Sequence, residues 1–187
     1  YTGTGTALGS LTATVTADTT GTGTGGVVTW NYSVAASAAE YLGDGDSKVE
    51  TFDVAFTDNN GFTVTKTISV TITGTNDAPV ITAEDLVGGV TELVTPVGNL
   101  TDSGSISFTD VDLNDVHLVS ATGTPVGSVL GSLTAVKDSD TTGTGSGGQL
   151  TWSYSVAASA VEYLAAGQTK VANLEPIAKV AKKGLAA

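Results

Sequence analysis

The sequence predicts an all-β protein assembled from small β-sandwich units, and three observations support that prediction. The β-branched residues Thr and Val, which favour the pleated strand surface, are abundant. Several short segments alternate apolar and polar residues with the period of two that is typical of half-buried strands. Clusters of Gly, Asn, Asp and Ser separate these segments and supply the turns, with 24 Gly among 187 residues. Many short strands joined by Gly-rich turns are typical of a β-sandwich.

The expected strands follow one another closely along the chain. In order, they cover residues 10–16, 27–35, 52–57, 62–74, 105–109 and 116–121. Within the second of them, Trp30 and Tyr32 share the apolar face, which favours core packing for this tryptophan and for its counterpart Trp152. Residues 58–61, Asp-Asn-Asn-Gly, predict a hairpin turn between two strands. The Ala-rich block 36–42 breaks the alternation and predicts a short helical crossover.

A gapless internal repeat divides the chain into two copies of one unit. Residues 7–49 recur as residues 129–171, at an offset of 122 residues, with about two thirds of the aligned residues identical. The first copy, residues 1–77, contains this shared block and the segment that follows it, so it lacks its N-terminal strands. The second copy, residues 78–172, contains an opening segment and the shared block, so it lacks its C-terminal strands.

The tail, residues 173–187, belongs to neither copy. Its apolar residues recur at helical spacing, as Leu174, Ile177, Ala178, Ala181 and Leu185. Pro176 lies near the start of this pattern, and lysines lie late in it, where they suit the dipole of a helix. These features predict a short amphipathic helix; an ending unrelated to the repeat is the alternative.

Composition and charge argue against several classes of function. The net charge is −12 and all seven basic residues are Lys, so we expect no binding of nucleic acid. Cys is absent, which excludes disulfides, zinc-thiolate sites and a thiol nucleophile. The single histidine, His117, has no nucleophile partner, so we expect it to be structural and the protein not to be an enzyme. No apolar run reaches the roughly 18 residues of a membrane span, so we expect no membrane insertion.

Acidic and amide side chains gather around the junction of the two copies. The linker offers Asn76 and Asp77, and Asp110 and Asp112 lie on one side of an extended segment because side chains alternate there. Asp115 follows in the same turn. Ca²⁺ takes six to eight oxygen ligands from such groups, which makes calcium the site chemistry this pattern favours. The alternative is that these residues are turn formers and solvated loop charges.

Three separated motifs resemble one known family. They are VTITGTNDAPVI (70–81), GSISFTDVDLNDVHLVS (104–120) and WNYSVAASAAEYLGDGDSKVETFDVAFTDNNG (30–61). Each is similar to a segment of VCBS repeats, the cadherin-like modules of giant bacterial biofilm adhesins, and they occur in the order of that family. The resemblance implies tandem cadherin- or immunoglobulin-like β-sandwich domains with Greek-key character, located outside the cell and without enzymatic activity.

The resemblance also implies where calcium would bind. Cadherin-like modules hold calcium between domains with a linker Asn-Asp pair and a downstream Asp-x-Asp. By that analogy Asn76, Asp77, Asp110 and Asp112 would form one junctional site, with Asp115 as a further candidate. Glu92 resembles an early acidic position of the family and is a candidate ligand at the far end of the unit.

We therefore expect a secreted or cell-surface structural protein for adhesion or a biofilm matrix. Tandem repeats stiffened by Ca²⁺ would act as a spacer or as a self-assembling fibre subunit. The complementary missing strands of the two copies predict that neighbouring chains lend strands to one another, head to tail. The alternative is that the chain is a fragment of a longer repeat protein. The alternative is a glycan-binding module of a secreted bacterial protein, which an exposed Trp30 or Trp152 beside polar side chains would favour.

Overall fold

The computed structural model describes residues 1–121, 130–171 and 176–180, and the side chains of 1–120 and 130–171. The chain divides into two compact units, Tyr1–Asn76 and Asp77–Ala187, with the boundary one residue before the predicted one. The described residues form ten strands and two single-turn 3-10 helices, and none forms an α-helix, which confirms the all-β prediction. No helix among them is long and apolar enough to cross a membrane.

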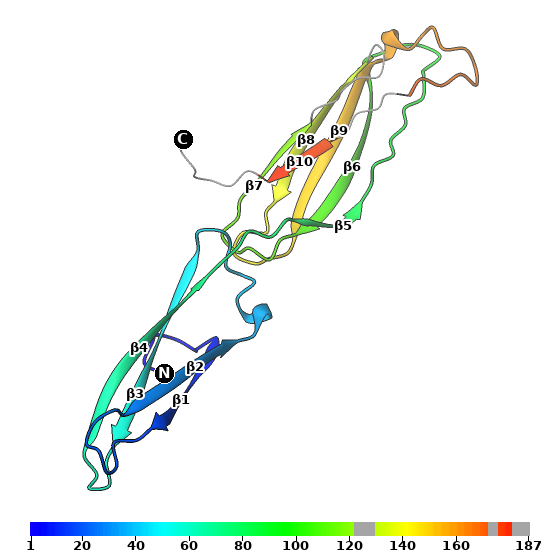
Figure 1. Cartoon of the computed structure of the whole chain (residues 1–187). Coiled ribbons are helices and arrows are strands. Elements are labelled where there is room, and N and C mark those ends of the chain that lie inside the picture. Colours follow the sequence, from blue (N-terminus) through cyan, green and yellow to red (C-terminus); the bar gives the residue numbers. More distant parts are fainter. Residues whose placement is uncertain (122–129, 172–175, 181–187) are drawn as a thin grey trace, which may run out of the picture. The chain divides into compact units, whose positions relative to one another are not determined.

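Two antiparallel hairpins make up the first unit (Figure 1). Its elements are β1 (Gly9–Ala17), β2 (Val27–Val34), the 3-10 helix η1 (Ala36–Ala38), β3 (Ser47–Thr57) and β4 (Thr63–Thr73). Asp58 holds the predicted turn between β3 and β4. Its Oδ1 accepts hydrogen bonds from the backbone amides of Asn60 and Phe62, each at 2.9 Å. Gly61 closes the turn with a φ of +87°, a conformation that only glycine adopts readily.

A buried carboxylate ties the two hairpins together. Glu50 of β3 is fully buried and accepts hydrogen bonds from the amides of Leu8, at 2.5 Å, and Gly9, at 3.2 Å. The hydroxyl of Tyr32 on β2 donates a third, at 2.8 Å. Burial alone would raise the pKa of Glu50, but these donors and Lys48 outweigh it and leave that pKa below its ordinary value. A buried charge is stable here because it is fully hydrogen-bonded.

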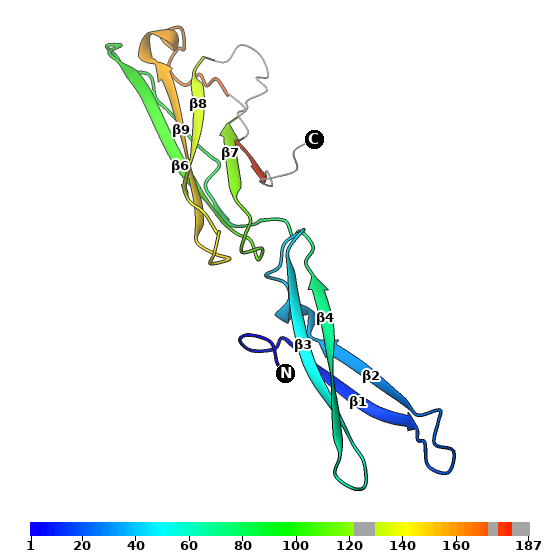
Figure 2. The same ribbon diagram turned by 90° about the vertical axis from the view of Figure 1, so that its left-hand side faces the viewer.

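The second unit contains a four-stranded antiparallel sheet in the order β5-β6-β9-β8, of which Figure 2 shows β6, β9 and β8 side by side. Its elements are β5 (Val80–Glu84), β6 (Asn99–Thr109), β7 (His117–Ala121), β8 (Ser132–Ser139), β9 (Gly148–Ala157), the 3-10 helix η2 (Ala158–Ala160) and β10 (Pro176–Val180). β10 pairs with β7, so the helix predicted for the tail is wrong for these five residues. Short isolated helices are marginal in water, whereas the edge of β7 offers backbone partners. The other residues of the predicted helix lie outside the described ranges.

The core of the second unit surrounds β9. Leu150, Trp152 and Val156 of this strand are buried, and β6 pairs along the whole of one edge. The indole Nε1 of Trp152 donates to the carbonyl of Asp85 at 2.5 Å. Its ring lies so close to Gly104 of β6 that a Cβ there would approach within 2.6 Å. The prediction of core packing is therefore confirmed for Trp152.

The same prediction is wrong for Trp30, which is 48% exposed. β2 pairs only with β1 among the described strands, so nothing equivalent to β6 covers the indole. Within residues 1–76 the face of β2 that carries Trp30 is therefore open at this position.

Candidate calcium site

Three aspartates are buried in the turn between β6 and β7. Asp110, Asp112 and Asp115 are 1%, 0% and 5% exposed, although ionised carboxylates normally stay in water. The turn forms because short acidic side chains hydrogen-bond to nearby backbone. The amide of Asp112 donates to Oδ1 of Asp110 at 3.0 Å, and the amide of Asp115 donates to the carbonyl of Asp112 at 3.2 Å.

The Gly-rich loop between β8 and β9 covers this turn. The amide of Asp110 donates to the carbonyl of Gly145 at 3.2 Å, and the amide of Gly143 donates to the carbonyl of Leu113 at 2.7 Å. The hydroxyl of Thr142 donates to the carbonyl of Asp115. The loop therefore shields the aspartates from solvent and supplies its own hydroxyls and carbonyls to the same region.

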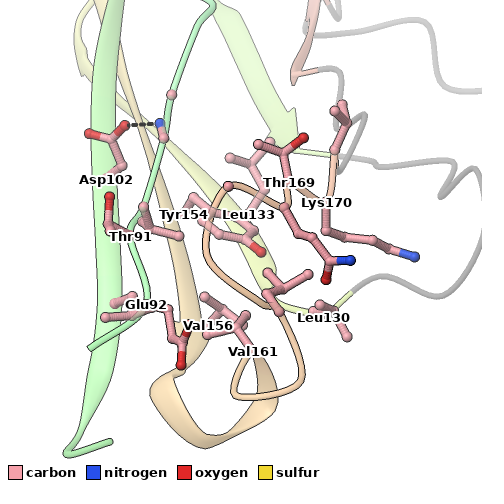
Figure 3. A pocket seen from close by; sticks show the side chains of 18 of the residues that line it. Thr91, Glu92, Asp102, Leu130, Leu133, Tyr154, Val156, Val161, Thr169 and Lys170 are labelled. Atoms are coloured by element: carbon pink, nitrogen blue, oxygen red, sulfur yellow. Dashed lines mark hydrogen bonds between the residues drawn. The ribbon is translucent and has the colours of Figure 1, made fainter. Parts of the chain in front are cut away.

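The structure brings together four of the six residues that the sequence singled out. The amide of Asp77 donates to Oδ2 of Asp112 at 2.8 Å, which joins the start of the second unit to the acidic turn. Asn76 is the last residue of the first unit. Glu92 lies elsewhere, in a groove that Val156 and Val161 also line (Figure 3). These two side chains belong to the end of β9 and the segment after η2, whereas Asp110 follows the far end of β6.

Three buried oxygen atoms in this region have no hydrogen-bond partner in the part of the chain that the structure describes. They are Oδ1 of Asp112, Oδ2 of Asp115 and the hydroxyl of Thr141. Burial raises the pKa of Asp112; the amide of Asp77 opposes that rise, and the carboxylates of Asp115 and Asp110 add to it. Unpaired, mutually repelling carboxylates are costly to bury, so the site is short of positive charge.

The donor set fits a hard cation in chemistry but not in its present geometry. Carboxylate and hydroxyl oxygens are ligands that Ca²⁺ prefers. However, both oxygens of Asp110 are already engaged, one by the amide of Asp112 and one by His117 Nε2 at 3.0 Å. No three His, Cys, Asp or Glu side chains within the described ranges are arranged to hold a metal ion. The residues best suited to an ion are thus Asp112, Asp115 and Thr141, after a local side-chain adjustment.

A buried charge network supports the turn from the other side. His117 is 4% exposed and places Nε2 against Asp110 and Nδ1 against Asp140, the latter at 2.7 Å. Lys137 bonds both Asp140 and the carbonyl of His117. Burial alone would raise the pKa of Asp140, but Lys137 and His117 lower it to about 2. His117 thus orients Asp110, and its imidazole bonds two carboxylates, those of Asp110 and Asp140.

Sequence reasoning did not single out Asp140, Lys137 or Thr141. One signal was present in the repeat: Lys137 stands where the first copy has Val15, so the second copy gains a cation beside a shared aspartate. Asp140 and Thr141 are identical in both copies and carried no such signal. Only the fold shows that their loop folds over the acidic turn.

Comparisons with protein-family models, with curated proteins and with solved structures find no match to this chain. The resemblance to VCBS repeats therefore rests on the three motifs themselves. Two of them meet at the site: the first ends just beyond Asp77, and the second contains Asp110 and Asp112.

Proposed function

We propose that this protein is a non-enzymatic extracellular structural module whose second unit is stiffened by Ca²⁺. One observation carries the proposal: Asp112 and Asp115 are buried, lie close to other carboxylates, and each has a carboxylate oxygen without a hydrogen-bond partner among the described residues. A divalent cation would satisfy both oxygens and cancel their repulsion.

The position of the turn suggests what the ion would do. Asp112 bonds the backbone of Asp77, the first residue of the second unit, so a cation on Asp112 would also hold the start of that unit. An ion that binds only the folded state stabilises it. We infer a spacer role, in which calcium stiffens the entry to each repeat of a cell-surface or matrix protein. The proposed architecture is a row of cadherin- or immunoglobulin-like sandwiches, supported by the antiparallel sheets and the internal repeat.

Thermal unfolding in calcium and in EDTA tests the proposal. We expect saturating Ca²⁺ to stabilise the protein by roughly 2–3 kcal/mol at a hundredfold excess over Kd, because the ion binds the native state alone. This stabilisation should raise Tm by several degrees. Asp112→Asn and Asp115→Asn should abolish the shift, whereas the exposed Glu162→Gln should keep it. Equal Tm values in calcium and EDTA for the unaltered chain would overturn the proposal.

A specific observation also favours glycan binding as a second candidate function. Trp30 exposes about half of its surface on β2, where an indole can stack on a sugar ring. Because Trp152 is buried, fluorescence quenching by a soluble collision quencher reports mainly on Trp30. Protection of that signal by oligosaccharides, lost in Trp30→Phe, would support this function. Unchanged quenching across a glycan panel would count against it.

A further inference from the structure

The second unit has an apolar groove that crosses its core. It encloses about 870 Å³, and side chains from several elements converge on it (Figure 3). Its apolar lining includes Leu130, Leu133, Tyr154, Val156, Val161 and Leu164. Val171, which also lines it, is 72% exposed. A groove of this size within a hydrophobic core exposes apolar area that folding would otherwise bury.

The first unit shows which segment covers the equivalent surface. There the β3–β4 hairpin lies against β2, and Phe52 contacts Tyr32 with ring centroids 5.8 Å apart. Phe52 and Leu42 are each 7% exposed. By the repeat offset, Tyr32 corresponds to Tyr154 and Leu42 to Leu164, so the groove is the place where a β3–β4 hairpin sits.

The second unit also keeps the residues that donate hydrogen bonds to the hairpin's buried glutamate. In the first unit Glu50 is bonded by the amides of Leu8 and Gly9 and by the Tyr32 hydroxyl. The corresponding residues of the second unit are Leu130, Gly131 and Tyr154.

The tyrosine and the glycine of this donor site lie close together in both units. In each copy the tyrosine hydroxyl lies so close to the glycine that a Cβ on the glycine would collide with it. Lys170, the counterpart of Lys48 at the start of β3, also lines the groove. Two carboxylates also line the groove, those of Glu92 and Asp102, and they carry the same sign of charge as the incoming Glu50. Asp102 already accepts a hydrogen bond from the amide of Gly89.

After Val171 the sequence no longer repeats residues 50–73, and the described residues 176–180 pair with β7 instead. The segment of matching shape and chemistry is β3–β4, which carries Glu50 and Phe52.

We propose that the groove of the second unit binds the β3–β4 hairpin of a second copy of this chain. Glu50 of that copy would accept hydrogen bonds from Tyr154 and from the amides of Leu130 and Gly131, and Phe52 would pack on Tyr154. The inference deepens the structural role proposed above by naming the partner, but it does not involve the cation.

Moving the hairpin from its own unit to the groove of another chain has a low energetic cost, because the contact residues at the two sites are equivalent. In the groove the hairpin would lie against the β5-β6-β9-β8 sheet, whereas in its own unit it lies against the two-stranded β1–β2 hairpin. Hairpin and groove are different surfaces of one chain, so the contact is heterologous and repeats head to tail.

Sedimentation velocity of the full chain over a wide concentration range tests the proposal, in EDTA and in calcium. We expect assemblies larger than the monomer at high concentration in both conditions. Val171→Asp, which places a charge in the groove at an exposed position, should abolish them. Val136→Asp is the matched control, because Val136 is 61% exposed on β8 and does not line the groove.

A pair of tyrosine variants separates hairpin docking from other association. Tyr154→Phe removes a donor to Glu50 of the incoming hairpin, so association should weaken about tenfold. Tyr32→Phe loosens the hairpin in its own unit and should leave association unchanged or strengthen it. Circular dichroism confirms that each variant is folded.

The proposal is overturned by a monomer at every concentration, by equal effects of Val171→Asp and Val136→Asp, or by equal weakening in both tyrosine variants. Calcium binding is read separately from Tm, so the two proposals can fail independently.

Discussion

The hairpins β1–β2 and β8–β9 are two copies of one sequence, and their backbones pair in the same register. Leu11 faces Tyr32 in the first unit, and Leu133 faces Tyr154 in the second. Each hairpin also has its register shift at the same place, just before the Gly-rich loop. Similar local sequence thus produces the same register and the same irregularity in the ladder.

The surroundings of the two hairpins differ sharply. Trp152 is 6% exposed under β6, whereas its counterpart Trp30 is 48% exposed. Asp140 bonds His117 and Lys137, whereas its counterpart Asp18 is exposed and accepts hydrogen bonds from Thr20 of its own loop. The difference teaches that burial and charge pairing are properties of the neighbouring strands and not of the repeated segment.

The largest expected effect separates the two tryptophans. Trp152→Ala should cost roughly 3–5 kcal/mol of unfolding free energy, because it removes a buried ring and leaves a cavity. Trp30→Ala should cost less than about 1 kcal/mol, because its site is already open to water. Calorimetric unfolding of both variants measures the two values. Similar losses in both variants would contradict the difference in burial between Trp152 and Trp30.

A smaller effect distinguishes the two tyrosines. Tyr32→Phe should destabilise the first unit by roughly 1.5–3 kcal/mol, because the buried carboxylate of Glu50 loses a donor. Tyr154→Phe should change the stability of the monomer little, because no carboxylate is bonded there within the described chain. Urea unfolding at low protein concentration measures both. A large loss in Tyr154→Phe under these conditions would contradict the difference between the units.

The smallest expected effect is the pH dependence that Asp140 contributes to the second unit. The folded pKa of Asp140, about 2, lies below its unfolded value, so the unfolded state takes up the proton first as pH falls. The stabilisation from Asp140 is therefore present above about pH 4 and is lost between about pH 4 and pH 2. Asp140→Asn should reduce the fall in Tm as the pH is lowered from about 4 to about 2, whereas Asp18→Asn, at an exposed position, should leave most of that fall in place. A series of Tm measurements against pH tests this. Equal effects would show that the His117 network contributes nothing specific.

Much of the strand pattern was predictable from residues alone. The alternation in β2 and the Asp58 turn are local features, and each was found where the pattern placed it. β5 was missed because it has a weak pattern and forms only by pairing with β6. β10 was missed because its residues have helical spacing, and pairing with β7 overrides that preference.

The candidate site was predictable in part for the same reason. Asp110, Asp112 and Asp115 are close in sequence, so their proximity follows from the turn itself. Asp77 lies more than thirty residues earlier, and its contact with Asp112 was expected only by resemblance. The burial of these carboxylates, and the roles of Thr141 and His117, depend on the β8–β9 loop folding over the turn.

Short-range pattern was enough to establish the all-β class, the repeat and the hairpin registers, because turn chemistry and side-chain alternation act within a few residues. Contacts between distant strands decided the features on which the proposed functions rest. Within the described ranges, they bury Trp152 but not Trp30, they leave oxygens of Asp112 and Asp115 without partners, and they leave the groove of the second unit open. The physical reason is that desolvation depends on which surfaces meet, and two copies of one segment meet different neighbours.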